Sequence, residues 1–162
     1  MLLLSILITS ALFLAPDSEP KNGDTGAIVY TEFTSVPEAM EYVVKQVLLP
    51  MDIIPLRYDA GIGYLVTERT LYKGYYNCDY VFSFLEDNGK IVIRCRPRDY
   101  DSAKTLDVFS DYSMSYNQRA MNGSPVLAYW DKFRKIVSGI PSTSVDYHGS
   151  EEEHQIKEYN LY

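Results

Sequence analysis

Residues 78–98 read CDYVFSFLEDNGKIVIRCRPR, and this stretch has the clearest hairpin pattern in the chain. Residues alternate in character on both sides of Asn88-Gly89, with the period of two that is typical of a β-strand. Asn-Gly suits the two positive-φ positions of a type I′ turn. The pattern therefore predicts a hairpin over 78–98, in which Asp87 pairs with Lys90.

The same register separates the two cysteines of the chain. Cys95 is expected opposite Phe82, and Cys78 is four positions further along that strand, which is about 13 Å at about 3.3 Å per residue. Bridged cysteines have Cα atoms within roughly 7 Å of each other. We therefore expect Cys78 and Cys95 not to be bonded to each other and to be small buried hydrophobes.

A first amphipathic helix is predicted to begin after Ser35. Ser35-Val36-Pro37-Glu38 matches a capping box, and Pro50 is expected to end the helix. Apolar residues recur between these points at the spacing of one helix face. The stripe consists of Met40, Val43, Val44, Val47 and Leu48.

A second helix is predicted near the end of the domain. Ser124 suits the N-cap, Pro125 suits the first helical position, and Gly139 and Pro141 follow the last turn. Its apolar stripe consists of Val126, Tyr129, Trp130, Phe133, Ile136 and Val137.

Further strands are expected before the hairpin. Ala27–Phe33 is short and rich in β-branched and aromatic residues. Residues 53–58 and 62–71 are also strand-like, and Asp59-Ala60-Gly61 divides them with a turn or bulge. The element order indicates an α+β fold, an antiparallel sheet of four to five strands with two helices packed on one face.

The sequence resembles a family of small secreted bacterial domains of unknown function, whose fold is like one half of the TATA-box-binding protein (a TBP-like half-fold). The resemblance covers roughly residues 27–139. It rests on GAIVYTEF and the helix after it, on the step at 59–63, on the hairpin and on the closing helix. It implies a fold and an exported protein, and no catalytic motif is carried over.

Four parts of the chain are expected. Residues 1–15 form a charge-free, signal-like apolar segment, too short to span a bilayer. A buried N-terminal strand or helix is the alternative. Residues 16–26 are predicted to be an exposed linker, 27–140 the α+β domain and 141–162 an acidic C-terminal tail. A secreted or periplasmic location without a transmembrane span follows.

Charge and composition exclude several kinds of partner. The 162 residues carry a formal charge of −7, which argues against nucleic acid. A zinc site of nitrogen and sulfur ligands alone would have to use nearly all of the two His and two Cys. His148 and His154 lie near Glu151–Glu153, but a solvated charge run is favoured there over a metal site. No cofactor, metal or catalytic motif is expected, and Gly61-Ile62-Gly63 is interpreted as a bulge.

Tyrosine is the unusual feature of the composition, with fifteen residues. Tyr72, Tyr75 and Tyr76 are expected in one loop, and Tyr112 and Tyr116 in a long excursion over 99–123 that has room for a short edge strand at 105–109. Half-buried tyrosines are common on sheet faces, and they also suit binding surfaces.

Arg94 and Arg96 are expected on one face of the second hairpin strand, where they can orient an acidic partner or block edge pairing. Together with Tyr72, Tyr75 and Tyr76 they are the candidate binding residues.

Two functions remain open. The first is an exported, non-enzymatic binding or assembly module with a protein or glycan partner in the envelope or outside the cell. The second is a small glycan or cell-wall hydrolase or lyase, using carboxylates such as Asp59 and Asp79. Two carboxyl groups about 5–10 Å apart in one cleft favour the second.

Overall fold

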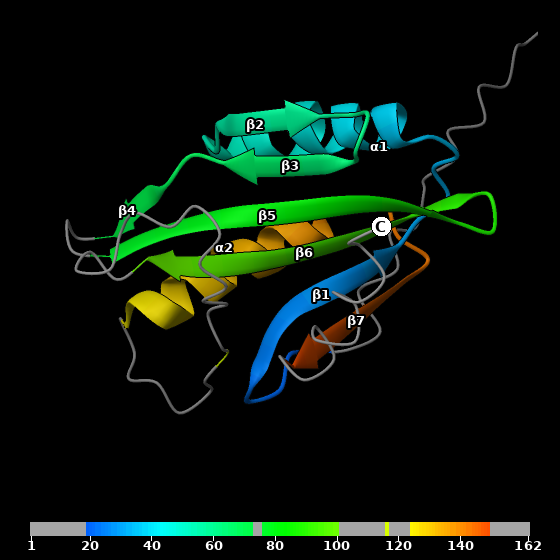
Figure 1. Ribbon diagram of the computed structural model, residues 1–162. Helices are drawn as coiled ribbons and strands as arrows, with labels where there is room; N and C mark the ends of the chain where they lie inside the picture. Colours follow the sequence, from blue (N-terminus) through cyan, green and yellow to red (C-terminus); the bar gives the residue numbers. More distant parts are fainter. Residues whose placement is uncertain (1–18, 73–75, 101–115, 117–123, 150–162) are drawn as a thin grey trace, which may run out of the picture.

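The computed structural model describes residues 19–72, 76–100, 116 and 124–149. Its strands form one antiparallel sheet in the order β2-β3-β5-β6-β1-β7, and the short β4 pairs with β5 (Figure 1). The strands are β1 (Asp24–Tyr30), β2 (Pro55–Asp59), β3 (Tyr64–Thr67), β4 (Thr70–Tyr72), β5 (Tyr76–Asp87), β6 (Lys90–Tyr100) and β7 (Ser144–Gly149). The α+β class is confirmed, but the sheet is wider than the four to five strands expected.

One of the additional strands is β7, which comes from the predicted acidic tail. Ser144–Gly149 pairs along β1, with Val29 opposite Val145 and Gly26 opposite His148. The alternation of Val145 and Tyr147 with polar residues suits a strand that is buried on one face. The tail prediction was therefore wrong for residues 144–149.

The first strand also begins earlier than expected. β1 starts at Asp24, inside the predicted linker, and ends at Tyr30 instead of Phe33. The backbone amide of Tyr116 donates to the Asp24 carbonyl, and the Gly23 amide donates to the Tyr116 carbonyl. These bonds hold the start of β1 despite its polar sequence.

The central hairpin has the predicted register. Asp87 pairs with Lys90, and Cys95 lies opposite Phe82. Asn88 and Gly89 have φ values of 52° and 75°, as a type I′ turn requires. Cys78 and Cys95 are both buried and carry free thiols, so the expectation that they are not bonded is confirmed.

The first helix begins where predicted but ends differently. α1 (Val36–Tyr42) continues as a π-helix η1 (Val43–Leu48) and a 3₁₀ turn η2 (Leu49–Met51). Ser35 is the N-cap residue but makes no side-chain capping bond, so the capping-box prediction was wrong. Pro50 lies within η2 and does not end the helical path, because the chain has already left the α pattern that proline disrupts.

The second helix has the predicted cap. α2 (Pro125–Ser138) begins after Ser124, whose hydroxyl accepts a 3.2 Å hydrogen bond from the Leu127 amide. Trp130 packs edge-on against Phe133 and Tyr116, with ring centroids 5.1 and 5.3 Å away. Tyr116, expected in the excursion, is therefore a partly buried residue beside the core.

Both helices cover the same face of the sheet, as predicted, and lie behind it in Figure 1. Their buried side chains and those of the covered sheet face form one apolar cluster. The helices contribute Ala39, Met40, Val43, Val47, Leu48, Tyr129, Trp130, Phe133, Ile136 and Val137, and the sheet contributes Ala27, Val29, Leu65, Cys78, Tyr80, Phe82, Phe84, Ile91, Ile93, Cys95 and Val145.

β2 and β3 are joined by a turn over residues 60–63, which the Asp59 side chain stabilises. The Asp59 Oδ1 atom accepts from the amides of Gly61 and Ile62, at 2.9 and 3.3 Å. Gly63 has φ 64°, and a Cβ at this position would lie 2.3 Å from the Phe84 carbonyl oxygen. The glycines therefore serve chain reversal and close packing in a turn, so the interpretation of Gly61-Ile62-Gly63 as a bulge was wrong.

Several predictions concern residues outside the described ranges. They are the signal-like segment 1–15, the strand at 105–109, Tyr75, Tyr112, the Glu151–Glu153 run and His154. Within the described ranges, no helix has the length and apolarity needed to cross a membrane.

Candidate binding surfaces

The predicted binding residues do not form one patch. Arg94 and Arg96 are half-buried on β6, opposite Ser83 and Val81 of β5. Tyr72 and Tyr76 are register partners at the end of β4 and β5. Tyr76 is five residues from Val81, the register partner of Arg96, which is roughly 16 Å along the strand. The tyrosines and the arginines therefore lie in separate regions of the sheet.

The arginines lie on the sheet face opposite the helices, which we call the open face. It carries every second residue of β5 and β6, including Val81, Val92, Arg94 and Arg96. Val81 and Val92 are nonetheless buried, and the buried Nε of Arg94 makes no hydrogen bond to a described residue. The open face is therefore only partly accessible to solvent around the two arginines.

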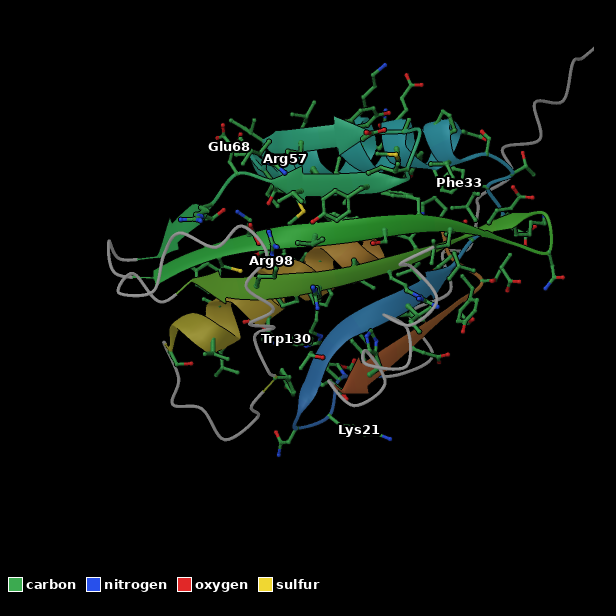
Figure 2. The ribbon with its side chains drawn as sticks, in the orientation of Figure 1. Lys21, Phe33, Arg57, Glu68, Arg98 and Trp130 are labelled. Carbon is green, nitrogen blue, oxygen red and sulfur yellow. The ribbon has the colours of Figure 1, made fainter. Side chains whose placement is uncertain are left out.

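A buried ion pair occupies one end of the open face. The Nε and Nη2 atoms of Arg98 each donate to one carboxylate oxygen of Asp79, both at 2.8 Å. The two residues lie directly opposite each other in the hairpin register, and Figure 2 places Arg98 over β5 and β6. Such a two-pronged contact orients both side chains. Sequence reasoning missed this pair, although the predicted register already set the two residues opposite each other.

His148 lies on β7 at the other side of the open face. It is buried, and a Cβ added to its neighbour Gly26 would lie 3.1 Å from His148 Cε1 and 3.2 Å from Arg96 Cβ. The prediction of a solvated histidine in a charged tail was wrong, because Gly26 leaves room for the imidazole over β1. The described residues contain no cluster of three or more His, Cys, Asp or Glu side chains that could hold a metal.

The most exposed apolar surface lies elsewhere, on and beside β2. Large hydrophobic side chains that are exposed in the described residues all fall between positions 49 and 62, with exposed fractions from 48% at Leu49 to 72% at Ile62. We call this set the β2 strip. It consists of Leu49, Ile54, Leu56, Tyr58 and Ile62.

The position of β2 in the sheet explains this exposure. β2 is the last strand beyond β3, and no described strand pairs with its outer side (Figure 1). Tyr58 is opposite the core residue Leu65, so it lies on the helix side, whereas Arg57 and Asp59 lie on the open face, opposite Val66 and Tyr64. The edge therefore presents an aromatic ring on one face and two opposite charges on the other.

Sequence reasoning predicted a strand at 53–58 but not its edge position. One signal was available, because a proline inside a strand is typical of an edge. Pro55 is the first residue of β2, and the pairing with β3 shifts between Pro55 and Arg57. A bulge of this kind protects an edge from unwanted pairing. Here the bulge protects only the start of β2, and residues Arg57–Asp59 keep the regular strand register with β3.

The groups considered for catalysis have structural roles. The Asp59 carboxylate holds the turn amides and the Asp79 carboxylate binds Arg98. Burial raises the pKa of the Cys95 thiol above its ordinary range, which disfavours the thiolate form that a nucleophile needs. Burial and the neighbouring Cys78 and Tyr129 likewise raise the pKa of Tyr80.

Comparisons with known proteins add no relative. No family model matches the sequence, and the search of curated proteins finds no match either.

Proposed function

We propose that the protein is a non-enzymatic binding module that contacts a protein partner through the β2 strip. The observation that carries this proposal is the concentration of exposed apolar side chains at positions 49–62, on and beside a sheet edge. Exposed apolar side chains that gather in one region mark interaction sites in many proteins. The unpaired outer side of β2 adds backbone groups that can pair with an extended segment.

The chemistry of the strip favours a protein over a glycan. Four of its five members are Leu or Ile and only Tyr58 is aromatic. Aliphatic side chains gain binding free energy by removing apolar area from water, whereas sugars present mostly hydroxyl groups. The alternative of a carboxylate-dependent hydrolase or lyase is not favoured, because the two acids named for it already bind protein groups.

An envelope or extracellular location belongs to the same proposal. It is supported by the charge-free run Leu2–Ala15 and by the resemblance to small secreted bacterial domains. The TBP-like half-fold is likewise proposed from that resemblance. It is compatible with an antiparallel sheet whose helices share one face.

The test is capture of a protein from the native envelope by the purified full chain. Leu56→Asp combined with Ile62→Asp is expected to lose at least about tenfold of the recovered partner, because both changes place charge on the contact surface. Both side chains are exposed, so the fold is expected to survive.

Lys21→Asp is the matched control, because Lys21 is exposed and lies near the opposite side of the sheet, whereas Arg57 marks the β2 side (Figure 2). Equal recovery by the wild type and the double variant would refute the β2 strip as the contact. Turnover of a glycan by the purified chain would refute the non-enzymatic function.

The tyrosine end of the sheet is tested in the same assay. Tyr75→Ala combined with Tyr76→Ala removes two of the predicted contact residues. If recovery stays at the wild-type level, Tyr75 and Tyr76 are excluded as the contact.

A further inference from the structure

We propose that the partner of the β2 strip is a second copy of this chain, joined edge to edge through β2 about a two-fold axis at Tyr58. This inference rests on the proposed function and names its partner. It starts from the charges on β2, where Arg57 and Asp59 flank Tyr58 with opposite signs.

Antiparallel pairing about Tyr58 makes these charges complementary. Each Arg57 then lies opposite Asp59 of the other copy, so that two oppositely charged pairs form in one interface. Both side chains are on the open face of their own sheet, and a two-fold axis normal to the sheet keeps them on a common face.

Other alignments of the same edge are less favourable. An antiparallel pairing about Arg57 sets the two arginines opposite each other, and a parallel in-register pairing does the same for Arg57 and for Asp59. Like charges that face each other destabilise a strand pair. The order of charges along Arg57-Tyr58-Asp59 therefore favours pairing about Tyr58 over these two alignments.

The carboxylate of Asp59 can make this contact and keep its hydrogen bonds to the turn amides. Its Oδ1 accepts from the Gly61 and Ile62 amides. Its Oδ2 makes no hydrogen bond within the described ranges 19–72 and 76–100, and it can accept from the guanidinium of the second copy. Both Arg57 and Asp59 are exposed.

The apolar residues of the strip are arranged consistently with this axis. Tyr58 meets Tyr58 of the second copy on the helix side, where an aromatic pair stabilises facing strands. Ile54 and Ile62 are each four residues from Tyr58, on opposite sides. The two-fold axis therefore brings the Ile54 end of one copy towards the Ile62 end of the other.

The test is the oligomeric state of the full chain, measured by sedimentation equilibrium. The wild type is expected to form a dimer at about 100 μM. Arg57→Asp and Asp59→Lys each create two facing like-charge pairs in the homodimer, and each is expected to weaken self-association at least about tenfold.

Mixing the two variants provides the decisive measurement. In the mixed dimer the introduced carboxylate of one chain faces the introduced ammonium of the other, and the unchanged Asp59 faces the unchanged Arg57. Dimerisation is therefore expected to recover towards the wild-type level. Asp59→Asn keeps the oxygen that accepts from the turn amides and removes only the charge. This variant is also expected to form a weaker dimer, which would show that the effect of Asp59→Lys does not come from misfolding. Lys21→Asp is the control and is expected to dimerise like the wild type.

Three outcomes would overturn the inference. They are a wild-type chain that stays monomeric at about 100 μM, a dimer unaffected by Leu56→Asp, and a variant mixture no stronger than its parts. A monomeric wild type that still captures a different envelope protein through Leu56 would overturn the self-pairing alone. The β2 strip as the contact surface of the proposed function would fail if that capture also survives Leu56→Asp combined with Ile62→Asp.

Discussion

The two outer strands of the sheet differ sharply in what they expose. On β7, Val145 packs in the core and His148 is buried over Gly26, so each face of this strand carries a buried side chain although Asp146 is exposed. On β2, Leu56 and Tyr58 are exposed. Both strands lie at the border of the same described sheet, so the difference in exposure comes from the side chains around them. Tyr147 contacts Trp130 of α2 and Val145 packs in the core, whereas no described residue covers the outer part of β2. An edge position by itself therefore does not create a contact surface.

The largest expected effect is on the covered edge. Val145→Asp places a carboxylate in the apolar cluster. We expect the free energy of unfolding to fall by about 4 kcal/mol. Urea unfolding followed by tryptophan fluorescence measures this change, and Val145→Ile is the control. A loss below about 1 kcal/mol would show that β7 is not part of the cooperative fold.

The second effect concerns the centre of the sheet, between the two edges. Arg98→Ala leaves the buried carboxylate of Asp79 without its two-pronged partner, and we expect a loss of about 3 kcal/mol in unfolding free energy. A double-mutant cycle with Asp79→Ala measures the coupling between the side chains. If the two losses are simply additive, the pair does not act as a unit.

The third effect is alkaline sensitivity at the covered edge. Burial, with a smaller contribution from Cys95, raises the pKa of Tyr147 on β7 from 10.0 to about 12. Below pH 10 both states hold the proton, so the stabilisation is complete. Above pH 10 the unfolded chain releases it first, and the stabilisation is lost as pH rises through 12.

Burial also raises the pKa of the Cys95 thiol from 9.0, which starts this loss near pH 9. Unfolding midpoints between pH 9 and 12 are the measurement. Tyr147→Phe is expected to lose less stability over this interval than the wild type. Identical slopes for the two chains would contradict a shifted Tyr147.

The smallest effect is expected on the exposed edge. Leu56→Asp places the same charge as Val145→Asp on the other outer strand, where it meets water. In dilute, monomeric protein the unfolding free energy is expected to change by less than about 0.5 kcal/mol. The same urea titration measures it. A loss as large as that of Val145→Asp would show that Leu56 is buried in solution.

The parts of the fold that were predicted correctly depend on neighbours in the sequence. Asn88-Gly89 favours one turn whatever surrounds it, and the turn sets the β5–β6 register, including the separation of Cys78 from Cys95. Ser124 caps α2 through an amide three residues away. The capping box at Ser35 and Glu38 failed although its pattern is equally local, because the backbone there forms the helix without the side-chain bond.

The candidate site was not predictable in the same way. Arg94 and Arg96 were identified from their alternation, but their partial burial depends on what packs over the open face. Tyr116 was assigned to an excursion, yet it contacts Trp130, because residues distant in sequence meet at the start of β1. Leu56 and Tyr58 were not predicted as contact residues, because a strand pattern does not show which strands lie at the border of a sheet.

The sequence by itself determined the α+β class, the hairpin register, the two helices and the face on which their apolar stripes meet, because short-range turn, capping and periodicity effects specify them. Only the tertiary structure decided that residues 144–149 form an outer strand, that Arg98 binds Asp79 in a buried pair, and that the exposed apolar side chains gather beside β2. Exposure depends on which distant segments remove a side chain from water, and that is a property of the packed chain.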